Sequence, residues 1–184
     1  MIEIIEPEQF KTLPWKNGLG ETTELAINEQ GNLDNFSWRL SIASVVNDGV
    51  FSDFSGYHRN LALIKGKGLS LQHDGKNVDM LDKLLDVASF DGSCKTLGKL
   101  TDGAIKDFNI ITANDNVSAQ VDCYIEPQQV AIKLQENSLC FAYSLSGAMK
   151  ISAFQTENSA VPVGYLAKLS LTTGTLYTSD AADA

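Results

Sequence analysis

Apolar and polar residues alternate one by one along many short stretches of this 184-residue chain. The clearest stretch is 36–43, where Phe36, Trp38, Leu40 and Ile42 alternate with Ser37, Arg39, Ser41 and Ala43. A period of two places successive side chains on opposite faces of a β-strand, whereas an amphipathic helix needs a period of 3.6. Further strands are predicted at 61–64, 69–71, 119–125, 130–134, 139–145, 149–153 and 176–178, and a hairpin turn at Asp74-Gly75. Many short strands favour an all-β, antiparallel sandwich or barrel.

Helical signals are few. Pro7 suits the first position of a single turn over 7–10, and 80–87 (MLDKLLDV) is the other candidate helix. We expect one domain over 1–184, because 43% of the residues are hydrophobic and can form a sizeable core. Turn residues at 101–104 divide that domain into possible halves, 1–103 and 104–184.

Charge and targeting signals exclude several classes of protein. The formal net charge is -9 and the lysines are scattered, so we expect no nucleic-acid partner. Two glutamates interrupt the apolar start of the chain, and no stretch approaches the ~18 consecutive apolar residues of a membrane span. Cys94, Cys123 and Cys140 are widely spaced, as is typical of free thiols in a reducing compartment. A cytoplasmic protein without a membrane partner is therefore expected.

Arginine is rare in this chain and is restricted to two positions. Of 14 basic residues, only Arg39 and Arg59 are arginines. A guanidinium group offers a planar fork of donors that matches a carboxylate, which a lysine ammonium does not. Arg39 lies mid-strand beside Trp38, on the same face as Ser41. Two interpretations remain open: Arg39 binds a ligand, or it forms an ion pair with an acidic residue on a neighbouring strand.

The surroundings of Arg59 and a second polar segment add further candidates. Arg59 follows a glycine- and aromatic-rich stretch, 49–58, whose phenylalanines are typical of loop anchors. His58 could serve as a general base or simply form a hydrogen bond in the loop. Asp107 and Asn109 are predicted to share one strand face, where they could orient a polar ligand, pair with Arg39 or close a turn.

The sequence offers little support for a metal site or a phosphate-binding loop. The two histidines, His58 and His73, are fifteen positions apart, and a histidine-based metal site needs two or three histidines and usually a carboxylate. The glycines of 18–20 match no phosphate-loop spacing, and a strand rather than a helix is expected after them. We expect no metal and no other cofactor.

Four segments in the first two thirds of the chain resemble one family. The stretch 14–22 (PWKNGLGET) resembles the PWKNGxGxT pattern of HutD/Ves proteins, and 36–43 is similar to their FxWRLSxA strand. The stretch 49–59 is similar to GxFSxFxGxxR, and 103–110 to the first part of GxxxDFNxM. The chain departs from the family at Leu19, where many members have glycine, and at Ile111, where many have methionine. It is identified as a member of the HutD/Ves family.

This resemblance implies a cupin-like (bicupin) fold without a metal, and a link either to histidine utilisation or to a stress-associated role. It implies a pocket that takes a small anionic metabolite, such as urocanate or a formylated glutamate derivative. The positions that match are Lys16, Asn17, Arg39, Ser41, Arg59, Asp107 and Asn109.

Three hypotheses for the function follow. The first is a small-molecule-binding protein with a regulatory role, in which Arg39 clamps the ligand carboxylate. The second is a metal-independent enzyme on the same metabolites, with His58 or Asp107 as general base. The third is a scaffold that acts through an apolar surface patch. A homodimer is compatible with each of them.

Overall fold

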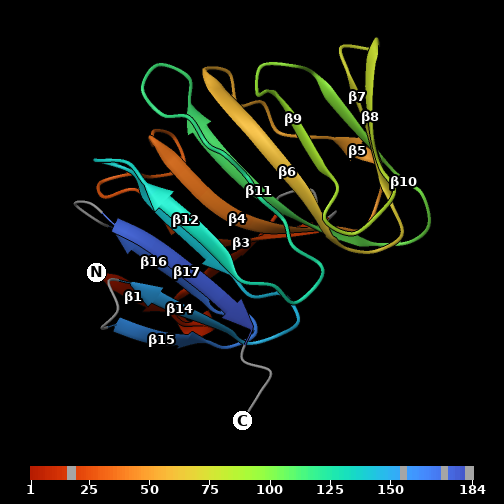
Figure 1. Ribbon diagram of the computed structural model, residues 1–184. Helices are drawn as coiled ribbons and strands as arrows, with labels where there is room; N and C mark the ends of the chain where they lie inside the picture. Colours follow the sequence, from red (N-terminus) through yellow and green to blue (C-terminus); the bar gives the residue numbers. More distant parts are fainter. Residues whose placement is uncertain (16–19, 154–156, 171–173, 181–184) are drawn as a thin grey trace. The chain divides into compact units, whose positions relative to one another are not determined.

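The structure is a computed structural model that describes residues 1–15, 20–153, 157–170 and 174–180 (Figure 1). Apart from a single 3-10 turn, η1 (Pro7–Gln9), its regular elements are β-strands. All pairings between strands are antiparallel. The all-β prediction and the short turn after Pro7 are therefore confirmed.

The chain divides into two compact units. The larger unit is Phe10–Cys123, and the smaller unit combines Met1–Gln9 with Tyr124–Ala184. This division differs from the halves expected from the turn at 101–104, which connects two strands of the larger unit. The physical reason is hydrogen bonding between strands that are distant in the sequence. The N-terminal strand Ile2–Ile5 pairs with Leu166–Ser170, whereas the strand after the turn, Ile105–Ala113, pairs with Trp38–Val45 and Tyr57–Lys65.

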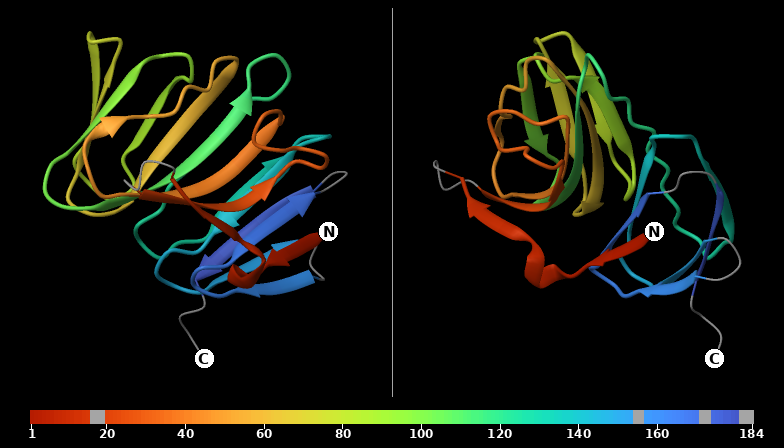
Figure 2. Two further views of the ribbon diagram at one scale, coloured as in Figure 1. Left: turned by 180° about the vertical axis from the view of Figure 1, so that it is seen from behind. Right: turned by 90° about the vertical axis from the view of Figure 1, so that its left-hand side faces the viewer.

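The larger unit is built from two sheets. The six-stranded sheet has the order β2 (Lys11–Pro14), β3 (Gly20–Ile27), β4 (Trp38–Val45), β11 (Ile105–Ala113), β6 (Tyr57–Lys65) and β9 (Val87–Asp91). The four-stranded sheet has the order β5 (Gly49–Val50), β10 (Thr96–Leu100), β7 (Leu69–His73) and β8 (Asn77–Leu81). The two sheets lie face to face in the right-hand view of Figure 2. Within the described ranges they are separate sheets, so this unit is a two-sheet sandwich rather than a closed barrel.

The core of the larger unit lies between these sheets. Leu61 and Leu63 come from the six-stranded sheet, Leu69 and Leu71 come from the other, and all four are fully buried. They alternate with residues that point out of the sandwich, as the period of two predicts. Burial of one such side chain stabilises the fold by about 1.5–3 kcal/mol.

The smaller unit also has two sheets and a core of its own. One sheet has the order β1 (Ile2–Ile5), β16 (Leu166–Ser170) and β13 (Leu139–Tyr143). The other has the order β12 (Val130–Leu134), β17 (Gly174–Asp180), β14 (Met149–Ala153) and β15 (Glu157–Val161). Ile151, Val161, Ala167 and Leu169 form its buried centre.

Two elements predicted from the sequence are wrong. Residues 80–87 form the end of β8, a loop and the start of β9 instead of a helix. Asp86 accepts hydrogen bonds from the backbone N–H groups of Asp82 and Lys83, and Leu85 has a left-handed φ of 69°, which a helix does not allow. Residues 119–125 alternate but form no strand, because they are mostly exposed and pair with no neighbouring strand in the described part of the chain.

Among the described residues there is no helix that is both long enough and apolar enough to cross a membrane.

Candidate functional site

Both arginines project from one row of the six-stranded sheet. Arg39 on β4 and Arg59 on β6 lie opposite Ile111 of β11, the strand between them. Adjacent strands are about 4.8 Å apart, so the two arginine Cα atoms are about 10 Å apart and their side chains point to the same face. Both arginines are buried, with 6% and 5% of their surface exposed. The sheet thus gathers two cations that are twenty positions apart in the sequence.

Arg39 is engaged in an internal ion pair. Its Nε donates to Oε2 of Glu24 on β3 at 2.8 Å, and both side chains are largely buried. Glu24 lies opposite Ser41, next to a bulge in the pairing of β3 with β4. Of the two interpretations that the sequence leaves open for Arg39, the ion pair with a neighbouring strand is present in the structure.

Arg59 has a different environment, which is aromatic rather than ionic. Its Nη2 donates to Oδ1 of Asn109 at 2.7 Å, and its Nη1 lies 3.5 Å from the carbonyl oxygen of Ser52. Its Cζ lies 5.2–5.5 Å from the ring centres of Phe51, Phe54 and Phe90. Its buried Nε has no hydrogen-bond partner, and no carboxylate oxygen of the described residues lies within 4.0 Å of its guanidinium group.

The charge of Arg59 persists at neutral pH. Burial lowers the pKa of its guanidinium to about 10, Asp107 acts in the opposite direction, and the positive charge of Arg39 lowers the pKa further. A pKa of about 10 still leaves the group almost fully protonated at pH 7. The interior therefore contains a cation that lacks a direct carboxylate partner among the described residues.

Asp107 is the most deeply buried carboxyl group of this cluster. It has no exposed surface, and its Oδ1 accepts a hydrogen bond from Nδ2 of Asn109 while its Oδ2 has no partner. Burial raises the pKa of Asp107 to about 7, although Arg59 and the bond from Asn109 act to lower it. Near neutral pH the group is therefore a mixture of carboxylic acid and carboxylate.

Five of the predicted residues share the inner face of the sheet. Ser41 lies opposite Asn109 and is 2% exposed, and both are on the same face as Arg39, Arg59 and Asp107. Arg39 and Ser41 are two positions apart on β4, as are Asp107 and Asn109 on β11, and residues two apart on a strand point to the same face. Arg59 joins them because it pairs with Ile111 of β11. Lys16 and Asn17 lie outside the described residues.

His58 is on the other side of the sheet. It precedes Arg59 on β6 and therefore points away from the arginine cluster, and its Nε2 forms a hydrogen bond with Oγ of Ser89 at 2.8 Å. His58 and Asp107 consequently face opposite sides, so they cannot act together on one ligand in the interior.

Two further residues belong to this site that the sequence patterns did not indicate. Glu24 completes the ion pair with Arg39, and Phe90 packs on Arg59 from β9. The sequence could have indicated Glu24, because a buried arginine requires a counter-charge. Glu24 lies on β3, the strand that directly precedes β4 and pairs with it. Phe90 had no such signal, since its contact depends on the pairing of β6 with β9.

The second histidine has both ring nitrogens occupied. Nδ1 of His73 lies 2.9 Å from Oγ1 of Thr96, and Nε2 lies 3.0 Å from Oδ2 of Asp79. Within the described part of the chain, no group of three or more His, Cys, Asp or Glu residues is arranged to hold a metal ion.

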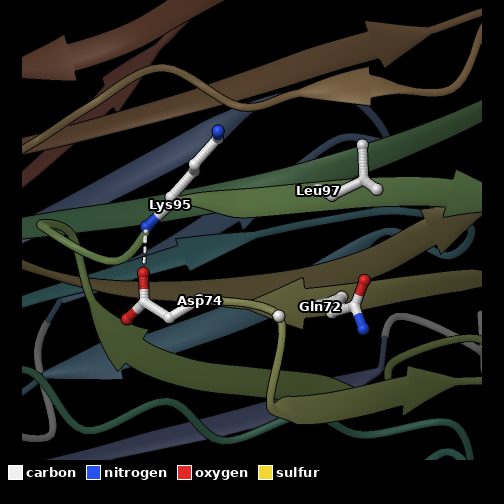
Figure 3. A pocket seen from close by; sticks show the side chains of 5 residues that line it. Gln72, Asp74, Lys95 and Leu97 are labelled. Carbon is white, nitrogen blue, oxygen red and sulfur yellow. Dashed lines mark hydrogen bonds between the residues drawn. The ribbon is translucent and has the colours of Figure 1, made fainter.

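Two surface hollows of about 460 Å³ each lie in the larger unit, and neither is lined by an arginine. One is lined by Gln72, Asp74, Gly75, Lys95 and Leu97 (Figure 3). There Asp74 accepts a hydrogen bond from the backbone N–H of Lys95 at 2.9 Å, and the Lys95 ammonium points away from it (Figure 3). The polar groups of this hollow do not converge on a common point. The other hollow lies around His58.

Comparison with known proteins shows the family. The model of the HutD family matches residues 7–180. The chain belongs to the HutD family. This confirms the family predicted from the four sequence segments, and the HutD assignment covers both units of the chain.

Curated relatives of this HutD-family chain come from several bacteria. It is 36% identical over 123 residues to an uncharacterized 21.2 kDa protein in the hutC 3' region of Pseudomonas putida, a match that covers 67% of this chain and 64% of the relative. It is 34% identical over 108 residues to Protein Ves of Escherichia fergusonii, covering 58% of this chain and 56% of that protein. The matched segments thus span less than two thirds of these relatives.

Solved structures show the same fold over nearly the whole chain. A conserved protein of unknown function from Pseudomonas aeruginosa PAO1 has a TM-score of 0.78 and 25% identity, with 99% of this chain and 94% of that chain covered. HutD from Pseudomonas fluorescens SBW25 has a TM-score of 0.69 and 23% identity, with 98% and 94% covered. At this identity the second likeness shows the HutD fold alone.

Proposed function

We propose that the larger unit binds a small carboxylate compound through Arg59, in a regulatory role. The observation that carries the proposal is the buried guanidinium group without a carboxylate within 4.0 Å among the described residues. A buried charge without a partner is unfavourable, and a ligand carboxylate would supply the missing counter-charge with two hydrogen bonds.

Arg59 is a better candidate than Arg39 for direct contact with the ligand. The Nε of Arg39 is already bound by Glu24, whereas the Nε of Arg59 is free. Arg39 contributes a second positive charge on the same face, which favours an anion beside it. When Asp107 is protonated, it removes one negative charge and offers an O–H donor to a ligand oxygen.

The candidate ligands are suggested by the relatives. The Pseudomonas putida protein is named for the hutC 3' region, and one similar structure is a HutD protein. Carboxylates of histidine degradation are therefore the first compounds to test: urocanate, formylglutamate and formiminoglutamate. Binding of such an intermediate would allow the protein to respond to the flux through the pathway.

Replacement of Arg59 by lysine tests the site. Arg59→Lys keeps the charge but loses the planar fork, so we expect at least about a tenfold loss of affinity, or about 1.4 kcal/mol. Calorimetry and thermal unfolding would measure it, since a ligand at 100 times its dissociation constant adds about 2.7 kcal/mol of stability.

Arg39→Lys is the matched control, because it makes the same change on the arginine that already has a carboxylate partner. We expect a smaller loss of affinity in this variant. Unchanged affinity in Arg59→Lys, or no saturable binding of any of the three acids at millimolar concentration, would contradict the proposal.

A metal-independent enzyme is a second candidate function, and Asp107 is the observation that favours it. A pKa of about 7 and an unpartnered Oδ2 suit a general acid or base at neutral pH. This alternative predicts that Asp107→Asn abolishes turnover of the same acids, followed by NMR of the products, while binding survives. Absence of any product with the unaltered protein would leave binding alone.

A further inference from the structure

The segment 51–56 connects β5 with β6 (Figure 1) and covers the guanidinium group of Arg59. The rings of Phe51 and Phe54 lie 5.5 and 5.2 Å from its Cζ, and the carbonyl oxygen of Ser52 lies 3.5 Å from its Nη1. The polar residues of the same segment are exposed. A single layer of chain therefore separates the guanidinium group from solvent at this point.

Arg59 is closed off from solvent in this conformation. Only 5% of its surface is exposed, and its Nε is buried. A carboxylate compound that binds Arg59 must therefore displace a group that covers it. Phe90 and Asn109 also contact the guanidinium group, but they belong to paired strands, whereas 51–56 forms no strand. The segment is thus the part of the cover that opens with the fewest broken hydrogen bonds.

Hydrogen bonds between this segment and the rest of the unit are few among the described residues. The N–H groups of Phe51 and Phe54 each donate to a backbone carbonyl at 2.9 Å, and the carbonyl of Gly56 accepts a bond from the N–H of Asn114 at 3.0 Å. The 3.5 Å contact of Arg59 with the segment is long for a hydrogen bond. Local opening therefore leaves the two sheets intact.

The covering position is nevertheless a specific one. A Cβ atom at Gly98 of β10 would lie 2.5 Å from the ring of Phe51, so the ring packs closely on the bare backbone of that strand. Within the segment, Asp53 accepts hydrogen bonds from the backbone N–H and the Oγ of Ser55, at 2.8 and 2.7 Å. This turn keeps its shape without bonds to the sheet, so the segment can leave its position and return to it as a preformed unit.

Gly56 lies where the segment joins β6. Its φ is 89°, in a region that residues with a side chain rarely adopt, and a Cβ atom there would meet nothing within 4 Å. Glycine is therefore required at this position by the backbone conformation of the covering state and not by close packing. A residue of this kind at the end of a loop suits a hinge.

We propose that the segment 51–56 is a lid over Arg59, which opens about Gly56 to admit a carboxylate compound and then closes over it. The identity of the compound rests on the proposed function, whereas the motion of the lid does not. Closure excludes water from the guanidinium group and so strengthens its attraction for a carboxylate. In the closed state the rings of Phe51 and Phe54 limit the size of the compound that fits.

Hydrogen exchange of the full chain without ligand tests the motion. We expect the amides of Phe51 and Phe54 to exchange by local opening, at least about tenfold faster than amides in the paired parts of β6 and β11. The Nε–H of Arg59 has no partner within the described residues and reports the same opening. The Nε–H of Arg39 is bonded to Glu24 and is the control in the same NMR spectrum, since the chain has only two arginines.

A pair of glycine substitutions tests the hinge. Gly56→Ala strains the closed backbone and relieves that strain on opening, so exchange of the Phe54 amide and the Arg59 Nε–H should rise about tenfold. Gly75→Ala is the matched control, because Gly75 also has a positive φ, 71°, and open space for a Cβ atom, but lies in the hairpin between β7 and β8. It should change exchange at Arg59 by less than about twofold. Equal acceleration by both substitutions would overturn the inference.

Urocanate connects the lid to the proposed ligand. At ten times its dissociation constant it should slow exchange of the Phe54 amide and the Arg59 Nε–H by about tenfold, because only the free fraction of the protein opens. Saturable binding of urocanate without any slowing would show that the compound bypasses the lid, which would contradict the proposal.

Exchange of Phe51 and Phe54 no faster than that of β6 and β11 would also overturn the lid. This comparison uses the unaltered chain, so it stays decisive if Gly56→Ala folds poorly. If urocanate, formylglutamate and formiminoglutamate all fail to bind while the lid opens as expected, the proposed function fails and the motion stands.

Discussion

Asp107 links the chemistry of the interior to the stability of the larger unit. Its folded-state pKa of about 7 lies above the value of about 3.9 in an unfolded chain, mainly because it is fully buried. Between these two values the folded protein holds a proton that the unfolded chain has released. The free energy of unfolding therefore gains from Asp107 below about pH 4, and this gain is lost as the pH rises through about 7.

Asp107→Asn should remove this dependence on pH. Below about pH 4 the two proteins should have similar stability, because the carboxylic acid and the amide are both neutral in the folded and the unfolded chain. At pH 5 the variant should already be the more stable by about 1.5 kcal/mol, because the unfolded aspartate is ionised there while the folded one is not. At pH 8 the variant should be the more stable by roughly 2–4 kcal/mol, since one pKa unit corresponds to about 1.4 kcal/mol. Urea unfolding at pH 5, 6, 7 and 8 would measure the difference. Asp34→Asn is the control, and parallel curves for Asp107→Asn and the unaltered protein would contradict the assignment.

At the scale of single elements, the pairing of β3 with β4 depends on Gly20. A Cβ atom at Gly20 would overlap the carbonyl oxygen of Ser44 and lie 3.1 Å from the ring of Trp15. The glycine is therefore required by the close approach of two strands, and β4 is the strand that carries Arg39. The ion pair between Glu24 and Arg39 spans the same pair of strands.

Gly20→Ala should weaken this pairing. We expect it to lower the free energy of unfolding by about 1–3 kcal/mol, as overpacking does elsewhere. Gly49→Ala on β5 is the matched control, because a Cβ atom there meets nothing within 4 Å, and its effect should stay within about 0.5 kcal/mol. Chemical unfolding of both variants measures the contrast. Equal effects would show that the contact at Ser44 relaxes without cost.

At the scale of the whole molecule, the two units have separate buried centres. Leu61 belongs to the core of the larger unit and Leu169 to that of the smaller unit, and both are fully buried. Truncation of either to alanine should cost about 2–5 kcal/mol. The stability that each leucine supplies is expected to be local to the strands that share its core.

Native-state hydrogen exchange of the two truncations tests this expectation. Leu169→Ala should reduce the protection of amides in β1, β13 and β16 more than in β6 and β11, and Leu61→Ala should do the reverse. The two variants control for each other, because the same side chain is shortened in each. A uniform loss of protection across all five strands in both variants would mean that the chain unfolds as one cooperative unit.

Much of the local structure of this chain could be predicted from its sequence. The period of two identified strands such as β4, and Asp74-Gly75 identified the hairpin between β7 and β8, where both residues have positive φ. The inner-face pairs Arg39 with Ser41 and Asp107 with Asn109 followed from the same period. Residues 80–87 and 119–125 were misassigned because a local pattern does not reveal whether a partner strand is available.

The sequence by itself determined which side chains share a face of each strand, because the pleat of a strand depends only on its backbone. Only the tertiary structure decided that Arg39 and Arg59 flank Ile111, that Glu24 neutralises the first, and that phenylalanines surround the second. The order of strands in a sheet arises from burial summed over the whole core and from hydrogen bonds between distant segments. That order separates an arginine with a carboxylate partner from one without a carboxylate within 4.0 Å among the described residues.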